Sequence, residues 1–201
     1  MTTVPAARGT RDLLIDAARG CLLDEGFAGL STRKVAERAG VPLSQIHYHF
    51  GAKQGLVVAV LDAENERLLE RQRRMYAQDL PLWRRWEQAC DFLEDDVESG
   101  YVRVLHEMLS AGWSDKRVAQ AVRELQMGWI ELLTSVAKEA AVPLGPFAPE
   151  EVVALIAAAF LGAEEMILSG FEEQTVPVRS ALRKIGLLIR AAEGRHEEKT
   201  A

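Results

Sequence analysis

The sequence has few cysteines and no long uncharged hydrophobic segment. Its 201 residues include two cysteines, Cys21 and Cys90, and both fall on the apolar faces of expected helices. Cysteines placed in this way are typical of small core residues in a reduced compartment, and they do not indicate a disulfide framework. The longest uncharged apolar run, residues 152–163, is too short to cross a bilayer. Because residues 1–12 contain no apolar core, we expect no signal peptide, no membrane partner and a cytoplasmic location.

The sequence also lacks the residue patterns that build catalytic and metal sites. Neither cysteine lies in a Cys-x-x-Cys pair, and there is no glycine-rich phosphate loop or nucleophile elbow. His47 and His49 are two residues apart, so on a helix their side chains diverge and cannot share a metal ion. We therefore expect no metal, no cofactor and no enzyme activity. An enzyme remains an alternative only if a buried carboxylate such as Glu164 has a strongly shifted pKa.

Acidic residues outnumber basic ones overall, but not in every part of the chain. The net charge is −6, which is unusual for a DNA-binding protein. Residues 1–55 hold seven Lys or Arg and five Asp or Glu, a balance of +2, whereas residues 56–201 hold 17 and 25, a balance of −8. No Asp or Glu occurs between residues 39 and 53. Since binding to a phosphate backbone depends on the local field, the N-terminal part remains compatible with nucleic acid.

The stretch at residues 30–53, LSTRKVAERAGVPLSQIHYHFGAK, predicts two short helices around a tight turn. Ser31 or Thr32 can cap the first helix with its hydroxyl group. Gly40 can adopt the left-handed conformation that ends a helix, and Pro42 fits the first turn of the next one. This pattern indicates a helix-turn-helix, although spacing alone does not distinguish it from other helical hairpins.

Residues 10–56 resemble the N-terminal DNA-binding domain of the TetR family of transcriptional regulators. The similar segments are AARGCLLDEGFAGLSTRKVAERAGV, IHYHF and AKQGL, which together cover about a quarter of the chain. The family usually has Ser and Gly near the start of its recognition helix, where this chain has Pro42 and Ser44, and it favours Tyr at the position of His47. These departures affect the expected base preference and one phosphate contact, and they leave the expected fold unchanged.

The resemblance implies that the second helix of the pair enters the major groove of DNA. Leu43, Ser44 and Gln45 are predicted to read base edges, because an amide can pair with adenine and an apolar group can touch a thymine methyl group. The remaining predicted DNA-binding residues, which hold phosphates or lie on the same exposed surface, are Thr32, Arg33, His47, Tyr48, His49 and Lys53. Phosphate contacts of this kind set the register of a protein on the duplex.

The remainder of the sequence predicts an all-α protein with two domains. We expect a three-helix head with the helix-turn-helix at residues 1–52, and a helical effector-binding and dimerisation domain at residues 53–201. No segment alternates in the manner of a β-strand. Beyond the head, helices are expected at about residues 52–75, 82–99, 101–113, 115–141, 149–168 and 178–192.

All four tryptophans lie in the predicted C-terminal domain. Together with methionines and a few polar groups they can line an apolar cavity, or they can simply form the core. The resemblance implies an inducer cavity between these helices, which favours the first alternative. The predicted ligand-binding residues are Trp86, Tyr101, His106, Met108, Trp113, Met127, Trp129, Phe160 and Glu164.

The expected helix at residues 149–168 is apolar on nearly every side. Such a helix must be buried on every side, either against a partner subunit or at the centre of a monomer. The resemblance implies that the last two helices of each subunit form a four-helix interface in a homodimer. The predicted dimerisation residues are Ala158, Leu161, Gly162, Leu182, Ile185 and Ile189.

These observations lead to one functional hypothesis and two alternatives. The hypothesis is a dimeric repressor that binds a near-palindromic operator in double-stranded DNA and is released by a small, partly apolar ligand. The alternatives are a DNA-binding regulator without a small-molecule effector, and an all-α ligand-binding protein or enzyme. The sequence does not identify the effector, the operator or the regulated genes, and it leaves activation open as well as repression.

Overall fold

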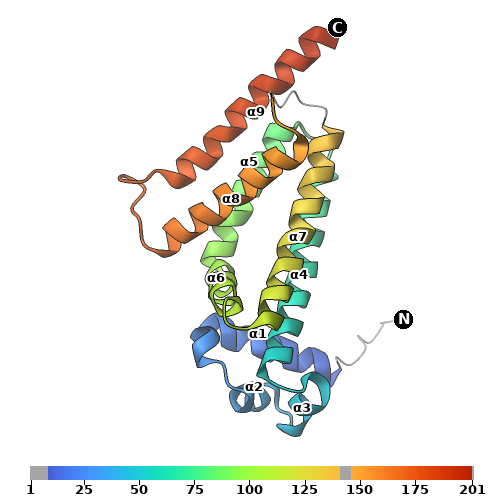
Figure 1. Cartoon of the computed structure of the whole chain (residues 1–201), viewed down its shortest axis with the longest axis vertical. Coiled ribbons are helices and arrows are strands. Elements are labelled where there is room, and N and C mark those ends of the chain that lie inside the picture. Colours follow the sequence, from blue (N-terminus) through green and yellow to red (C-terminus); the bar gives the residue numbers. More distant parts are fainter. Residues whose placement is uncertain (1–8, 141–145, 201) are drawn as a thin grey trace, which may run out of the picture. The chain divides into compact units, whose positions relative to one another are not determined.

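The structure is a computed structural model that describes residues 9–140 and 146–200, with side chains described as far as residue 194. Over these residues the chain forms nine α-helices and no strand, which confirms the all-α prediction (Figure 1). The helices are α1 (Thr10–Gly29), α2 (Thr32–Ala39), α3 (Ser44–Phe50), α4 (Lys53–Tyr76), α5 (Leu82–Glu98), α6 (Tyr101–Gly112), α7 (Lys116–Glu139), α8 (Pro149–Leu168) and α9 (Val178–Thr200).

The last helix is longer than the sequence analysis predicts. Hydrophobic periodicity places its end near residue 192, but α9 continues to Thr200. Its final residues include several Glu, Lys and Arg, which are good helix formers and need no apolar partner. The helix expected at residues 115–141 is α7, and its predicted last residue, 141, lies outside the described residues.

The chain divides into two compact units. The first contains the described residues up to Glu66 together with Arg103–Leu125, and the second contains Arg67–Val102 and the described residues from Gln126 onward. Helices α4, α6 and α7 contribute residues to both units, so no single point in the chain separates them. In the described part of the chain, no helix is long and apolar enough to cross a membrane.

In the first unit, α1 supports α2 and α3 through an apolar core. Leu14, Ala18 and Leu22 of α1 are fully buried, as are Val35 of α2 and Ile46 of α3. The α1 residues follow the three- and four-residue spacing that places side chains on one face of a helix. Burial of Val35 and Ile46 fixes which side of each short helix faces outward.

Phe27 is the point at which three helices of the first unit are joined. Gly26 has a φ of 73° and interrupts the helical conformation of α1. The backbone N–H of Phe27 donates to the Glu107 carboxylate of α6 at 2.5 Å, and its C=O accepts from Lys53 Nζ of α4 at 2.9 Å. Arg103 donates to the other oxygen of Glu107 at 2.6 Å. We refer to Phe27, Lys53, Arg103 and Glu107 as the Phe27 clamp.

Arg103 also donates to backbone carbonyls of α1 that lie just before the interruption at Gly26. Its guanidinium donates to the C=O groups of Leu22 and Leu23. Such groups at the end of a helix need a partner when they are shielded from water. The clamp therefore stabilises the break in α1 as well as the contact with α6.

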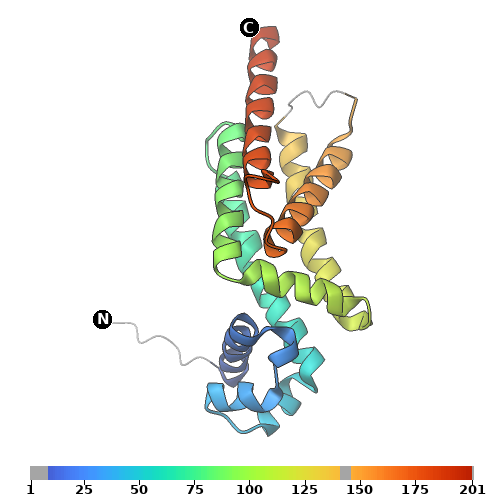
Figure 2. The same ribbon diagram turned by 90° about the vertical axis from the view of Figure 1, so that its left-hand side faces the viewer.

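In the second unit, α5 and α9 lie side by side, as Figures 1 and 2 both show. The indole N–H of Trp86 donates to the C=O of Leu182 at 2.8 Å. Gly186 allows this close approach, because a Cβ atom there would lie 3.2 Å from Trp86 Cδ1. Both cysteines are free and buried, Cys21 in the first unit and Cys90 in the second, in agreement with the prediction of core residues. Burial raises the pKa of Cys90 to about 11.

Substitution of Gly40 by Ala should destabilise the protein by about 1–2 kcal/mol, because Gly40 has a φ of 69° and a left-handed conformation is costly for residues with a Cβ atom. Gly194→Ala is the matched control: this glycine also has open space around its Cβ position but lies within α9. Alanine forms helix more readily than glycine, so this substitution should stabilise the protein by about 0.5–1 kcal/mol. Urea unfolding at a fixed protein concentration measures both effects, and equal effects would contradict the assigned conformation of Gly40.

Glu107→Ala should reduce the free energy of unfolding by about 1–3 kcal/mol, because it leaves the Phe27 N–H without its partner and removes the ion pair with Arg103. Glu124→Ala on the exposed surface of α7 serves as the control, since it removes an exposed hydrogen bond from Gln120 and a repulsion with Asp62. That change should remain within about 0.5 kcal/mol of the unmodified protein. A loss no larger than that of the control would show that the Phe27 clamp contributes nothing to stability.

Candidate functional site

The turn between α2 and α3 has the local geometry that the sequence predicts. Ser31 Oγ accepts from the Lys34 N–H at 3.2 Å and caps α2. The N–H of Gly40 bonds to the carbonyls at the end of α2, and the N–H of Val41 donates to the Ala36 C=O at 3.1 Å. Pro42 lies just before α3, which begins at Ser44. The two short helices therefore form a helix-turn-helix with a fixed turn.

The outer face of α3 carries the residues predicted to read bases. Leu43 is 41% exposed at the N-cap position, Ser44 is exposed and Gln45 is half-buried. Tyr48 is 81% exposed, which is unusual for an aromatic side chain without a partner molecule. His49 is half-buried and its ring packs edge-on against Tyr48.

His47 is exposed, and one side of its ring already has a partner. Its Nδ1 lies 3.1 Å from the C=O of Gly51, at the end of α3. Since a carbonyl only accepts, Nδ1 carries the proton in this contact and Nε2 remains directed to another partner. Thr32, the other small phosphate-binding candidate, is half-buried at the start of α2.

The basic residues of α2 make ion pairs with acidic residues. Lys34 pairs with Glu25 and Arg38 pairs with Asp24, and both pairs join α2 to α1. The hydrogen bond to Glu25 raises the pKa of Lys34, and the hydrogen bond to Asp24 raises the pKa of Arg38. Exposed pairs of this kind are weak, so these cations also remain able to meet an external anion.

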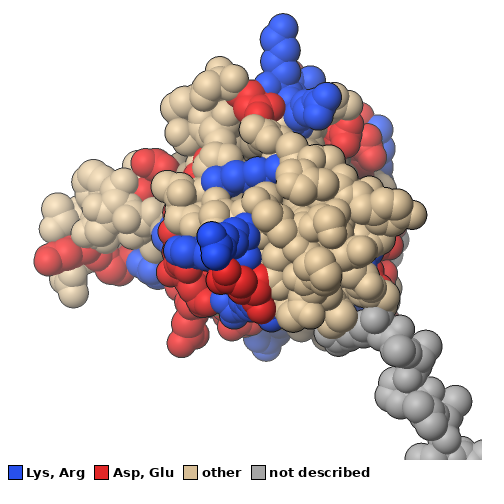
Figure 3. All heavy atoms as spheres, turned by 90° about the horizontal axis from the view of Figure 1, so that it is seen from below, with Lys and Arg blue, Asp and Glu red and all other residues tan. Residues whose placement is uncertain are grey.

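Arg33 is the most exposed of these cations, with 83% of its side chain accessible, and it pairs with Glu37 at 3.1 Å within α2. In Figure 3, which shows one face of the molecule, basic side chains lie in separate groups with acidic side chains beside them. A broad area next to them carries no charged residue. The surface therefore has a few cations, which suit phosphate contacts, beside a large uncharged area, which suits contacts with base edges.

Lys53 lies differently from a freely exposed phosphate ligand. Its ammonium group donates to the Phe27 C=O and lies 4.5 Å from the centre of the Phe27 ring. Burial lowers the pKa of Lys53. An ammonium group has three N–H donors, so this contact leaves two for another acceptor. Lys53 therefore connects the predicted DNA-binding surface to the Phe27 clamp.

The nine predicted ligand-binding residues are distributed over both units. His106, Met108 and Trp113 belong to the first unit, and the other six belong to the second. In the second unit Trp86 and Trp129 each pack edge-on against Phe160, with ring centres 5.6 Å and 5.8 Å apart.

The burial of the other predicted ligand-binding residues varies widely. Met108 is fully buried and Tyr101 is 8% exposed, whereas Trp113 is 88% and Met127 44% exposed. His106 and Glu164 are half-buried.

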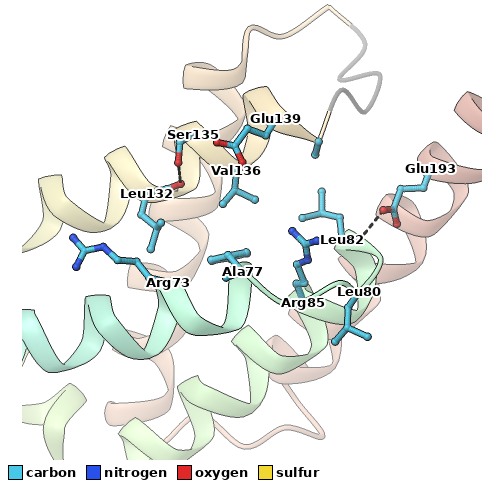
Figure 4. Close-up of a pocket in the computed structure, with 12 residues that line it drawn as sticks. Arg73, Ala77, Leu80, Leu82, Arg85, Leu132, Ser135, Val136, Glu139 and Glu193 are labelled. Carbon is cyan, nitrogen blue, oxygen red and sulfur yellow. Dashed lines mark hydrogen bonds between the residues drawn. The ribbon is translucent and has the colours of Figure 1, made fainter.

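The second unit contains an open cleft of about 600 Å³ that the sequence analysis did not identify. None of the nine predicted ligand-binding residues lines it. It lies between the end of α4, the start of α5, the last turns of α7 and one residue of α9 (Figure 4). The lining residues are Arg73, Tyr76, Ala77, Leu80, Leu82, Arg85, Leu132, Ser135, Val136, Glu139, Ala140 and Glu193. The sequence analysis missed them because they come from the ends of α4, α5 and α7, the residues next to those ends and Glu193 of α9, and no periodic pattern connects these segments.

The predicted dimerisation residues fall on two faces. Ala158 is exposed, and Leu161 and Gly162 are half-buried, on α8. Leu182, Ile185 and Ile189 of α9 instead pack into the apolar core of their own subunit with Trp86 and Cys90. The large apolar residues that are exposed on and near α8 and α9 are Leu155, Met166, Leu168, Phe171, Leu187 and Leu188.

Among the residues whose side chains are described, no group of three or more His, Cys, Asp or Glu is arranged to hold a metal ion. The candidate sites of the structure are therefore a helix-turn-helix with an exposed second helix, a cleft in the second unit, and exposed apolar side chains on the last two helices. Surfaces of the last kind mark contacts with other molecules when they are contiguous.

Comparisons with known proteins agree with this geometry. Residues 14–60 match the family described as bacterial regulatory proteins, tetR family. Over 107 residues the chain is 30% identical to TtgW of Pseudomonas putida, described as an uncharacterized HTH-type transcriptional regulator, and the match covers 53% of this chain and 77% of TtgW.

Solved structures show the same fold over most of the chain. A transcriptional regulator from Rhodococcus sp. Rha1 is 23% identical with a TM-score of 0.74, over 92% of this chain and 98% of that one. The multidrug binding protein EbrR, solved with imidazole, is 25% identical with a TM-score of 0.59, over 89% of this chain and 95% of that one. The helix-turn-helix, the match to the family and the similarity to TtgW together establish that this chain belongs to the TetR family of transcriptional regulators.

Proposed function

We propose that this TetR-family regulator is a dimeric repressor that binds a near-palindromic operator and leaves it when a small, partly apolar ligand binds. The observation that carries the proposal is the outer face of α3, where Leu43, Ser44, Gln45 and Tyr48 are accessible and the buried Ile46 holds the helix in place. This helix is narrow enough for the major groove of DNA.

The residues around α3 divide into two roles. Leu43, Ser44 and Gln45 lie at its N-terminal end and read base edges, because recognition helices contact bases mainly through their first residues. The side chains that hold phosphates and fix the register are Thr32, Arg33, His47, Tyr48, His49 and Lys53. Since Arg33 is paired only with the exposed Glu37, a phosphate can replace that carboxylate at little cost.

Dimerisation through α8 and α9 supports binding to two half-sites. Leu155 of α8 and Leu187 and Leu188 of α9 are 58%, 63% and 70% exposed, and a second subunit would remove them from water. We assign the interface to these exposed side chains together with Ala158, Leu161 and Gly162. Leu182, Ile185 and Ile189 support the interface from the core of the same subunit.

The ligand response is supported by EbrR, which is described as a multidrug binding protein. Within the first unit, the Phe27 clamp offers a route by which α6 affects the DNA-binding helices, because Glu107 on α6 and Lys53 at the start of α4 hold the same residue. Half-sites one helical turn apart require about 34–36 Å between recognition helices, so a small displacement lowers operator affinity.

Gln45→Ala and Lys53→Met should change DNA binding in different ways. Loss of the Gln45 amide should relax base preference at one operator position, with a loss of about 1–3 kcal/mol of discrimination. Lys53→Met should weaken binding to all DNA sequences about equally, and it should reduce the slope of log affinity against log salt concentration by about one unit. Fluorescence anisotropy with a fragment from upstream of the gene and a random duplex of equal length measures both. Gln54→Met, at an exposed neutral neighbour, is the control. If both variants lost the same affinity for both duplexes, the assignment of Gln45 to bases and Lys53 to phosphates would be contradicted.

Leu188→Glu should convert the dimer to a monomer, because it places a charge on the most exposed leucine of α9 and an unpaired charge is costly at a buried interface. Leu43→Glu, which adds a charge at the exposed N-cap of α3, should leave the dimer intact while it weakens DNA binding. Sedimentation equilibrium of both variants distinguishes these results. A Leu188→Glu protein that remains dimeric would exclude this face as the interface.

A further inference from the structure

The cleft of about 600 Å³ in the second unit has an aliphatic part and a charged part. The aliphatic part is formed by Ala77, Leu80, Leu82, Leu132, Val136 and Ala140. The charged groups are Arg73, Arg85, Glu139 and Glu193. Ligand pockets of about 300–1,000 Å³ commonly combine an apolar wall with a few charged groups that orient the ligand. The cleft therefore has the composition of a ligand pocket.

The two acidic residues of the cleft differ in their partners. Glu193 accepts from the backbone N–H of Leu82 at 2.7 Å and of Trp83 at 3.3 Å, so its carboxylate is bound to the first turn of α5 (Figure 4). Glu139 is exposed at the last residue of α7 and has no hydrogen bond or ion pair from its side chain in the described part of the chain. Neither carboxylate pairs with an arginine of the cleft.

The arginines of the cleft differ from the other arginines of the second unit. Arg71, Arg74, Arg84, Arg179 and Arg183 each pair with an Asp or Glu, and Arg190 lies over the ring of Trp83. Arg73 and Arg85, in contrast, make no side-chain hydrogen bond or ion pair with any described residue. Arg67 also has an interaction. Among the described arginines of the second unit, the two without an acidic or aromatic partner are therefore the two that line the cleft.

Arg85 is the more informative of the two, because it is not fully exposed. Its Nε atom is buried and has no hydrogen-bond partner among the described residues. Buried polar atoms normally have partners. The terminal N–H groups of a guanidinium match the two oxygens of a carboxylate. In Figure 4 Arg85 extends from α5 into the space next to Leu82 and Ala77, whereas Arg73 lies at one end of the group.

Tyr76 adds a neutral hydrogen-bond donor to the same place. Burial raises the pKa of Tyr76 far above its ordinary value, and the nearby charge of Arg85 acts in the opposite direction. The phenol therefore keeps its proton at neutral pH and lies close to the Arg85 guanidinium. Tyr76 and Arg85 both line the cleft, and a phenol and a guanidinium can each donate to a carboxylate.

We propose that this cleft binds a small organic acid, with its carboxylate on Arg85 and its hydrocarbon chain on the aliphatic wall. The inference deepens the proposed function, because it names the chemical class of the effector. Binding of the acid, however, is measurable without DNA. Arg73 contributes a long-range attraction at the mouth of the cleft, and Glu139 opposes the anion by repulsion.

Isothermal titration of the full chain with octanoate, octan-1-ol and octylamine provides the test. The three probes share a hydrocarbon chain and differ in the charge of the head group. Octanoate should bind about ten- to hundredfold more tightly than octan-1-ol, the range expected for a hydrogen bond to a charged group, and octylamine should bind most weakly. This comparison uses the unmodified protein, so it does not depend on whether any variant folds.

Three variants examine the assigned positions. Arg85→Met should remove most of the preference for octanoate over octan-1-ol, and Glu139→Gln should strengthen octanoate binding. Arg74→Met is the matched control, since Arg74 is a neighbouring arginine of α4 that pairs with Glu70 and does not line the cleft. It should change octanoate affinity less than twofold. Circular dichroism verifies that each variant is helical.

Equal binding of octanoate and octan-1-ol, or an octanoate affinity that Arg85→Met leaves unchanged, would overturn the inference. Weaker octanoate binding in Glu139→Gln would do so as well, because it would mean that Glu139 helps the ligand. A parallel measurement of operator binding separates this inference from the proposed function. If octanoate binds through Arg85 without releasing DNA, the acid site stands and the effector role fails; if other compounds release DNA and octanoate does not bind, the reverse holds.

Discussion

The arrangement of the first unit depends on how one interruption in a helix is stabilised. At Gly26 the backbone of α1 leaves the helical conformation, and the N–H and C=O of Phe27 bond to side chains of α6 and α4. A backbone break inside a packed unit leaves polar groups that need partners, and here Glu107, Lys53 and Arg103 supply them. The same contacts that satisfy the backbone thus bring α6 against the helices that carry the helix-turn-helix.

The cations near the two proposed binding sites differ in whether they have acidic partners. On the first unit Lys34 and Arg38 are paired with acids of α1, and Arg33 is paired within α2. These pairs are exposed and are easily exchanged for phosphates. In the second unit the described arginines are nearly all matched, which makes the unmatched Arg73 and Arg85 conspicuous. Electrostatic function therefore rests on a small number of cations and not on the net charge, which is negative.

The sequence predicts the local features of the fold well. Ser31 and Gly40 act through their own backbone geometry or through groups within four residues, and α2 begins and ends where they predict. Pro42 lies before α3 and not in its first turn, because Leu43 is the N-cap and the helix begins at Ser44. The long helices are also predicted, because apolar residues spaced three or four apart mark the face that each helix buries. The extension of α9 to Thr200 is not recognised in this way, because the sequence beyond residue 192 has no apolar stripe.

Features that depend on the assembly of distant segments were not predictable from the sequence. Leu182, Ile185 and Ile189 form an apolar stripe that fits either a subunit interface or a core, and only the packing of α9 on α5 places them in the core. Helical spacing also assigns Leu188 to this stripe, which is wrong, because Leu188 is 70% exposed and Leu187 beside it is 63% exposed. The cleft likewise combines residues from α4, α5, α7 and α9 with residues between helices, and Arg85 resembles any surface arginine until its buried Nε is seen.

The two cysteines give each unit an internal chemical marker. Cys21 lies in the core of the first unit and Cys90 in that of the second, and both are almost completely buried. The raised pKa of Cys90 keeps its thiol protonated, so it is a poor nucleophile for as long as the second unit stays closed. Alkylation of one thiol or the other therefore reports which of the two units opens, and when, without any engineered label.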